Sequence, residues 1–215
     1  FQNNLFYDIQ TGWAIQTQSG PTAGTSILNN TFIGHNPQRD GQIILWRHQN
    51  NVVIENNISY NPGAYFINNN IGYSYQGRDS INNPPRNIIR NNLVYGQSGV
   101  RIANYIIEAI YTIFTNNIVG STSAENPLFV NPNNYDFHLT SNSLVAIDKG
   151  NNVGLSSDLE GKQYIGAPDL GTYEYQGSVI TTDITPPSSP QNLRIITDTI
   201  VPTVSNIIIN PGFES

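Results

Sequence analysis

The chain has 215 residues, carries a net charge of −6 and lacks cysteine. Only 11% of its residues are charged, against roughly 25% in an average soluble domain. Its nine Lys and Arg residues form no basic stripe, which argues against nucleic acid as a partner. No apolar run is long enough to span a bilayer. The lack of cysteine excludes a disulfide scaffold and thiolate metal sites.

Asparagine replaces the missing charges, with about thirty copies, and it disfavours helices because its side chain competes for backbone hydrogen bonds. An Asn-Asn pair recurs in five segments: residues 1–7, 27–33, 54–60, 89–95 and 114–120. The second Asn of each pair is Asn4, Asn30, Asn57, Asn92 and Asn117, at spacings of 26, 27, 35 and 25 residues. Three nearly equal spacings and one insertion indicate a solenoid with one pair per coil.

The residues around each pair form columns. The column three before the second Asn is Phe1, Ile27, Ile54, Ile89 and Phe114; the column one after it is Leu5, Thr31, Ile58, Leu93 and Ile118. Both are nearly all apolar, so we expect both to point inward. The mixed column two before the second Asn (Gln2, Leu28, Glu55, Arg90 and Thr115) should point outward. The second Asn residues should stack as a ladder, each amide donating to one neighbour and accepting from the other.

A third strand in each coil is expected at residues 13–16, 42–46, 64–67 and 100–103. Three short strands per repeat predict an all-β fold, a right-handed parallel β-helix solenoid of about five coils with an Asn ladder, a C-terminal cap and an extended tail. Residues 1–125 would form the coils. Phe1 already lies within a repeat, so we expect further coils to precede it in the natural protein.

The sequence changes character after residue 125. Four motifs follow in order: Asn126-Pro-Leu-Phe-Val-Asn131, Tyr135-Asp-Phe-His-Leu139, Ala146-Ile-Asp148 and Pro168-Asp-Leu-Gly-Thr-Tyr-Glu174. Together they resemble the C-terminal region of secreted, pectate-lyase-like right-handed parallel β-helix proteins that precedes a choice-of-anchor Q type terminus. Asn126 and Asn131 replace acidic residues of that pattern, and Leu144-Val145 replaces Ser-Pro. The resemblance implies an extracellular or cell-surface location. Residues 126–176 should cap the solenoid, because open strand edges invite association.

Residues 177–203 form a linker rich in Pro, Thr and Ser, in which Thr185–Pro190 should be extended and stiff. Residues 204–215 are strand-like and resemble the start of a carbohydrate-binding jelly-roll module. We expect this tail to dock on its own solenoid or on a neighbouring molecule.

The family resemblance implies a polysaccharide or glycan as partner. Enzymes of this fold act on acidic polysaccharides through a Lys or Arg base, or through paired carboxylates. The two lysines, Lys149 and Lys162, lie in the cap region, and the expected third strands contain no Asp or Glu. A lyase base would have to be one of Arg47, Arg78, Arg86 and Arg101. The sequence shows no complete catalytic set, so the active site of any lyase or glycoside hydrolase would lie largely upstream.

The insertion between Asn57 and Asn92 concentrates aromatic and charged residues. Aromatic rings stack on sugars, while Arg and Asp bind hydroxyls or carboxylates. We predict a carbohydrate-binding surface formed by Trp46, Arg47, Tyr73, Tyr75, Arg78 and Asp79. The alternative is that the aromatic residues of this loop pack on the flank of the solenoid.

We predict no metal and no cofactor, since His35 and His138 lack spaced partners and the acidic residues follow no EF-hand pattern. Two N-glycosylation sequons occur, at Asn29-Asn-Thr31 and Asn57-Ile-Ser59.

Two functions are compatible with these features. The chain could be the C-terminal part of an extracellular carbohydrate-binding or polysaccharide-processing protein. Alternatively, it could be a non-catalytic structural subunit of an extracellular fibre or surface layer, assembling head to tail through its C-terminal tail.

Overall fold

The computed structural model describes residues 1–9, 12–17, 24–35, 41–46, 51–70, 87–103 and 112–177. All of them belong to one unit of the chain, Phe1–Ser178. The predicted linker and tail, residues 177–203 and 204–215, lie outside the described residues except for Gly177.

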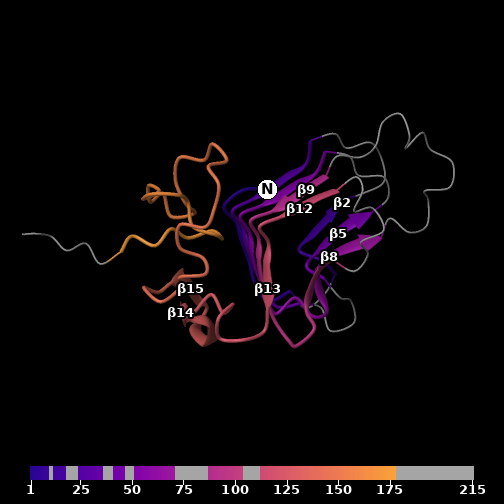
Figure 1. Ribbon diagram of the computed structural model, residues 1–215, viewed down its shortest axis with the longest axis horizontal. Coiled ribbons are helices and arrows are strands. Elements are labelled where there is room, and N and C mark those ends of the chain that lie inside the picture. Colours follow the sequence, from indigo (N-terminus) through magenta and orange to yellow (C-terminus); the bar gives the residue numbers. More distant parts are fainter. Residues whose placement is uncertain are drawn as a thin grey trace, which may run out of the picture. The chain divides into compact units, whose positions relative to one another are not determined.

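Three parallel sheets run along the coils (Figure 1). Sheet A contains β3 (Ser26–Leu28), β6 (Val53–Glu55), β9 (Asn87–Arg90) and β12 (Thr112–Thr115). Sheet B contains β1 (Leu5–Phe6), β4 (Thr31–Ile33), β7 (Ile58–Tyr60), β10 (Leu93–Tyr95) and β13 (Ile118–Gly120). Sheet C contains β2 (Ile15–Thr17), β5 (Ile43–Trp46), β8 (Tyr65–Asn70) and β11 (Arg101–Ala103). Each strand pairs with the equivalent strand one coil away, which confirms the predicted parallel β-helix and its third strands.

Apolar columns fill the inside of the coils. Ile27, Ile54 and Ile89 project from sheet A, and the in-register residues Ile15, Ile43 and Ile67 project from sheet C. All six side chains belong to one core cluster. Ile27, Ile54 and Ile89 are the central residues of the column from Phe1 to Phe114, which was predicted to point inward. Full burial of such a side chain contributes roughly 1.5–3 kcal/mol.

The second Asn of each pair forms the predicted ladder. In each rung, Nδ2 of one Asn donates to Oδ1 of the Asn in the following coil. The distances are 2.9 Å for Asn4–Asn30, 3.0 Å for Asn30–Asn57, 2.9 Å for Asn57–Asn92 and 2.9 Å for Asn92–Asn117. The backbone N–H groups of Asn4, Asn30, Asn57 and Asn92 also donate to the Oδ1 of the next Asn in the ladder. Asn30, Asn57 and Asn92 are fully buried, so these bonds satisfy amides that water cannot reach.

The first Asn of each pair adopts a left-handed backbone conformation, with φ between 50° and 59° at Asn3, Asn29, Asn56, Asn91 and Asn116. Asparagine tolerates this region better than most residues. One left-handed residue between two strands breaks the alternation of side chains. Residues an even number of positions apart would share a face in an unbroken strand, but they no longer do so when this residue lies between them.

That break makes one sequence prediction wrong. The column of Leu5, Thr31, Ile58, Leu93 and Ile118 does not point into the coils. Ile58 and Leu93 pack in a second core with residues of the C-terminal region. Thr31 Oγ1 accepts a hydrogen bond from the backbone N–H of Thr172. The adjacent positions Phe32 and Val94 point inward instead.

The C-terminal region lies on the outer face of sheet B (Figure 1). It begins with β14 (Phe129–Asn131), a 3₁₀ turn η2 (Pro132–Asn134) and the antiparallel strand β15 (Asp136–Leu139). Its apolar residues Phe129, Phe137, Leu139, Ala146 and Leu170 build the second core.

The first Asn of four of the five pairs fastens this region to the coils. Asn3 donates to Ser157 O at 2.6 Å, Asn29 to Asp169 O at 3.3 Å, Asn56 to Asn151 O at 2.8 Å and Asn91 to Lys149 O at 3.0 Å. In the mixed column (Gln2, Leu28, Glu55, Arg90 and Thr115), Leu28 and Glu55 are buried, whereas Gln2 and Thr115 are exposed. Glu55 is only 1% exposed and accepts from Asn151 Nδ2 at 2.7 Å, beside Arg90 Nε at 2.8 Å.

Candidate functional site

The predicted carbohydrate-binding residues begin at one edge of sheet C. Trp46, the last residue of β5, pairs with Asn70, the last residue of β8. The chain continues from these two positions into Arg47 and into residues 71–86. Arg47, Tyr73, Tyr75, Arg78 and Asp79 lie outside the described residues, and so does the side chain of Trp46. The register therefore brings together the starting points of both parts of the predicted site.

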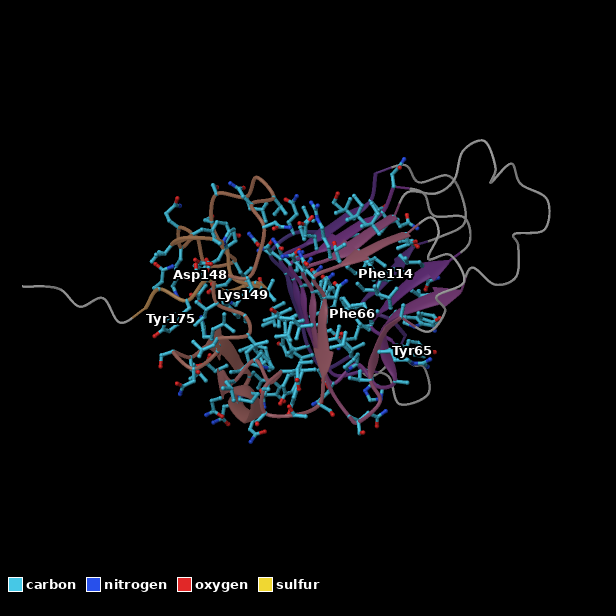
Figure 2. The ribbon with its side chains drawn as sticks, viewed as in Figure 1. Tyr65, Phe66, Phe114, Asp148, Lys149 and Tyr175 are labelled. Atoms are coloured by element: carbon cyan, nitrogen blue, oxygen red, sulfur yellow. The ribbon has the colours of Figure 1, made fainter. Side chains whose placement is uncertain are left out.

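The outer face of sheet C also carries an aromatic residue beside a cation. Tyr65 and Arg101 are register partners on β8 and β11, and the Arg101 guanidinium carbon lies 5.8 Å from the centre of the Tyr65 ring. Figure 2 shows Tyr65 on the outer side of the sheet, whereas Phe66 points into the coils. Arg101 is exposed and was one of four candidate bases. A cation over an aromatic ring is a stable arrangement in which both groups can still contact a ligand.

The hollows lined by described residues include two that contain no residue from the strands of sheet C. One, of about 350 Å³, is lined by Leu5, Phe6, Tyr7, Asp8, Ile9, Trp13 and Ala14 in the first coil. The other, of about 300 Å³, is lined by Asn152, Leu155, Ser156, Gln163, Tyr164, Gly166, Ala167 and Pro168. Neither contains any of the predicted binding residues.

The C-terminal region carries a charged cluster that the sequence did not predict. His138 Nδ1 lies 2.7 Å from Asp136 Oδ1, and its Nε2 lies 3.2 Å from Glu160 Oε1. Lys162 Nζ is 2.6 Å from the other oxygen of Glu160, and the Tyr173 ring lies 4.1 Å from the imidazole. Hydrogen bonds to His138 and Lys162 lower the pKa values of Asp136 and Glu160, respectively. The cluster links segments separated by more than twenty residues, so no local motif announces it.

Three buried carboxylates organise the same region. Asp158 and Asp169 each accept from backbone N–H groups of two or more residues, and Glu174 accepts from Ile165 and Asp169. Burial raises the pKa of Asp169 to about 6 and that of Glu174 to about 7. Each side-chain oxygen is occupied by the backbone. We therefore assign these acids to holding the loops together, not to an acid–base pair for hydrolysis.

Within the residues that the structure describes, no three His, Cys, Asp or Glu side chains are grouped so that they could hold a metal ion. The described part of the chain also has no helix of the length and apolarity needed to cross a membrane. In comparisons with known proteins, no family model, no curated protein and no solved structure matches the chain.

Proposed function

We propose that this chain is part of an extracellular glycan-binding protein that presents the outer face of sheet C, and the loops leaving it, to a polysaccharide. The observation that carries the proposal is the register of Trp46 with Asn70, which ends two neighbouring strands side by side. Arg47 and the segment holding Tyr73, Tyr75, Arg78 and Asp79 both continue from that edge.

The chemistry of these residues suits a sugar ligand. Aromatic rings provide flat apolar faces for sugar rings, and guanidinium groups bind carboxylates through paired, charge-assisted hydrogen bonds. Tyr65 and Arg101 supply the same two groups on the described face. Strands about 4.8 Å apart offer a regular surface along which an extended polymer can lie. The guanidinium groups favour a glycan that carries carboxylates.

Binding is better supported than cleavage. The four strands of sheet C contain no Asp or Glu, so they provide no carboxylate pair of the kind that glycoside hydrolases use. The buried acids of the C-terminal region are engaged with the backbone. Polysaccharide cleavage would need a base such as Arg101 and a neutralising group from elsewhere.

The proposal is tested by titrating the chain with uronic-acid oligosaccharides and with neutral oligosaccharides in a calorimeter. We expect binding of the acidic series, weakened at least ~10-fold by Arg78→Ala, Tyr75→Ala or Arg101→Ala, which corresponds to about 1.4 kcal/mol each. Lys149→Ala and Tyr135→Ala are the matched controls, because both residues are exposed on the C-terminal region. Wild-type binding by all three variants would refute the site. If the chain binds neither the acidic nor the neutral oligosaccharides, the proposed function is refuted.

A further inference from the structure

The hollow of about 300 Å³ in the C-terminal region shares no residue with the glycan surface proposed for sheet C. The less exposed part of its lining is apolar or aromatic and forms its floor. Leu155 and Tyr164 are half-buried there, and Pro168 is buried. Small-molecule sites in proteins begin at about this volume, so the hollow has room for one small ring.

The rim of the hollow is polar. Asn152, Ser156 and Gln163 line it and are exposed. Asn152 Oδ1 accepts from the backbone N–H of Gly154 at 2.9 Å, which orients the side chain and leaves its NH₂ group available. Within the described part of the chain, the Ser156 hydroxyl and the Gln163 side-chain amide have no hydrogen-bond partner. These groups offer both donors and acceptors to a ligand that carries several hydroxyls.

Hydrogen bonds to other parts of the molecule hold the walls in place. Gln163 pairs with Ser157 in an antiparallel bridge, and Ser157 O accepts from Asn3 Nδ2 at 2.6 Å. Pro168 O accepts from the backbone N–H of Gly150 at 2.8 Å. The hollow is therefore formed before a ligand enters, and a preformed site loses little conformational entropy on binding.

The charges around the hollow restrict the class of ligand. All eight lining residues are uncharged, so none can pair with a charged group. Acidic side chains lie behind the lining. A Cβ atom on Gly166 would come within 2.6 Å of Asp148 Oδ1. Burial raises the pKa of Tyr164, and the charge of Glu174 contributes to the increase. These carboxylates repel anions, so a neutral ligand is favoured.

We propose that this hollow binds one ring of a neutral sugar. The apolar face of the sugar would lie against Tyr164 and Leu155, and its hydroxyls would bond to Asn152, Ser156 and Gln163. This site differs from sheet C in its residues and in the charge of its ligand, because the guanidinium groups of sheet C favour carboxylates. Either proposal can therefore fail without the other.

The test is an NMR titration of the full chain, labelled with ¹⁵N, with the methyl glycosides of glucose, galactose and mannose. We expect at least one of them to shift the amide signals of residues 152–168 in a saturable way. The Kd should be on the order of 1 mM, as modest contacts from about a dozen non-hydrogen atoms give. The methyl glycoside of glucuronic acid should bind at least ~5-fold more weakly, because it carries a carboxylate.

Two variants test the assignment of the site. Gln163→Ala removes one amide from the rim and should raise the Kd roughly 3–10-fold. Ala167→Trp fills the hollow from an exposed position and should abolish the shifts. Asn142→Ala is the matched control, because Asn142 is exposed in the C-terminal region and does not line the hollow. Circular dichroism checks that each variant is folded.

Three results would overturn the proposal. The first is that none of the neutral glycosides shifts any signal, or that the shifts are confined to sheet C. The second is that the glucuronic acid glycoside binds as tightly as the neutral ones. The third is that Gln163→Ala and Ala167→Trp bind as the wild type does. If Ala167→Trp does not fold, the comparison of Gln163→Ala with Asn142→Ala decides.

Discussion

Asn56 and Asn151 bind each other through two hydrogen bonds, although 95 residues separate them. Asn56 Nδ2 donates to Asn151 O at 2.8 Å, and Asn151 N–H donates to Asn56 Oδ1 at 3.0 Å. Asn57, the next residue, donates instead to Asn92 of the following coil. The two residues of one Asn pair therefore have different tasks. The first binds the C-terminal region as well as its equivalent in the preceding coil, whereas the second bonds only within the coils.

Replacing Asn56 tests the first task. Asn56→Gly keeps the left-handed conformation without strain but removes the bonds to Asn151 and Asn29. We expect a loss of roughly 1–3 kcal/mol in the free energy of unfolding, measured by urea denaturation. Asn56→Ala should cost about 1 kcal/mol more, since alanine is strained at φ 59°.

Hydrogen exchange locates the effect of these variants. The amide of Asn151 should exchange faster in both, because its acceptor is gone. Unchanged exchange at Asn151 together with unchanged stability in Asn56→Gly would show that the contact contributes nothing.

Replacing Asn57 tests the second task. Asn57→Ala leaves the buried backbone N–H of Asn30 without its acceptor. It also removes the Nδ2 group that donates to Ile27 O, Glu55 O and Asn92 Oδ1. A buried unsatisfied group costs about 1–3 kcal/mol, so we expect a loss of roughly 3–5 kcal/mol by urea denaturation. Asn133→Ala, at an exposed position of η2, should change stability by less than ~0.5 kcal/mol. Similar losses in the two variants would contradict the role of the ladder.

Stability should decrease as pH rises from 5 to 8. Burial raises the pKa of Asp169 to about 6 and that of Glu174 to about 7, so the folded state retains protons that the unfolded state releases near pH 4. The stability is therefore highest below the pKa that the two acids have in the unfolded state. It is lost as the pH rises through the higher pKa values that they have in the folded state. We expect a decrease of about 2 kcal/mol, measured by urea denaturation at both pH values.

Glu174→Gln isolates the contribution of one acid. The variant is less stable at every pH, because an amide nitrogen faces a backbone N–H in place of a carboxylate oxygen. Its change in stability between pH 5 and 8 should nevertheless be smaller than that of the wild type. A wild-type stability that rises over this interval would contradict the prediction, as would parallel profiles of the two proteins. Asp148 faces both acids, and its charge disfavours their ionised forms. Asp158 accepts a hydrogen bond from the backbone N–H of Glu174.

Neither sequon should carry a glycan in folded protein. Asn29 and Asn57 are fully buried, and both amides are hydrogen-bonded. A glycan on Asn57 would break the ladder, and one on Asn29 would separate the C-terminal region from sheet B. Protein secreted from a glycosylating host should therefore have the same mass before and after enzymatic deglycosylation. A folded glycoform at either position would show that the pair is not buried in this way.

The repeat made the coils predictable from the sequence. Regular spacing identified the ladder residues Asn4, Asn30, Asn57, Asn92 and Asn117. The apolar stretches at 42–46 and 64–67 identified β5 and β8. These features follow from contacts between neighbouring coils, which leave a periodic signal.

The second core was not predictable in the same way. Alternation placed Ile58 and Leu93 on the wrong face, because the left-handed Asn56 and Asn91 shift the phase of the strand that follows. The contact of Asn56 with Asn151 joins a repeat to a segment without one, so no spacing indicates it. The charged cluster around His138 is equally non-local. The predicted carbohydrate-binding loop lies outside the described residues, and its role stays a prediction.

The attachment of the C-terminal region to the first Asn of four pairs has a consequence for the order of folding. The ladder bonds between coils span 25 to 35 residues, whereas hydrogen bonds to the C-terminal region span up to 161 residues. Loop closure is slower and more costly over longer separations, so the coils should form first. Until the last segment docks, Ile58 and Leu93 face water. Refolding should therefore have a slow second phase, during which the half-finished molecule is prone to aggregate.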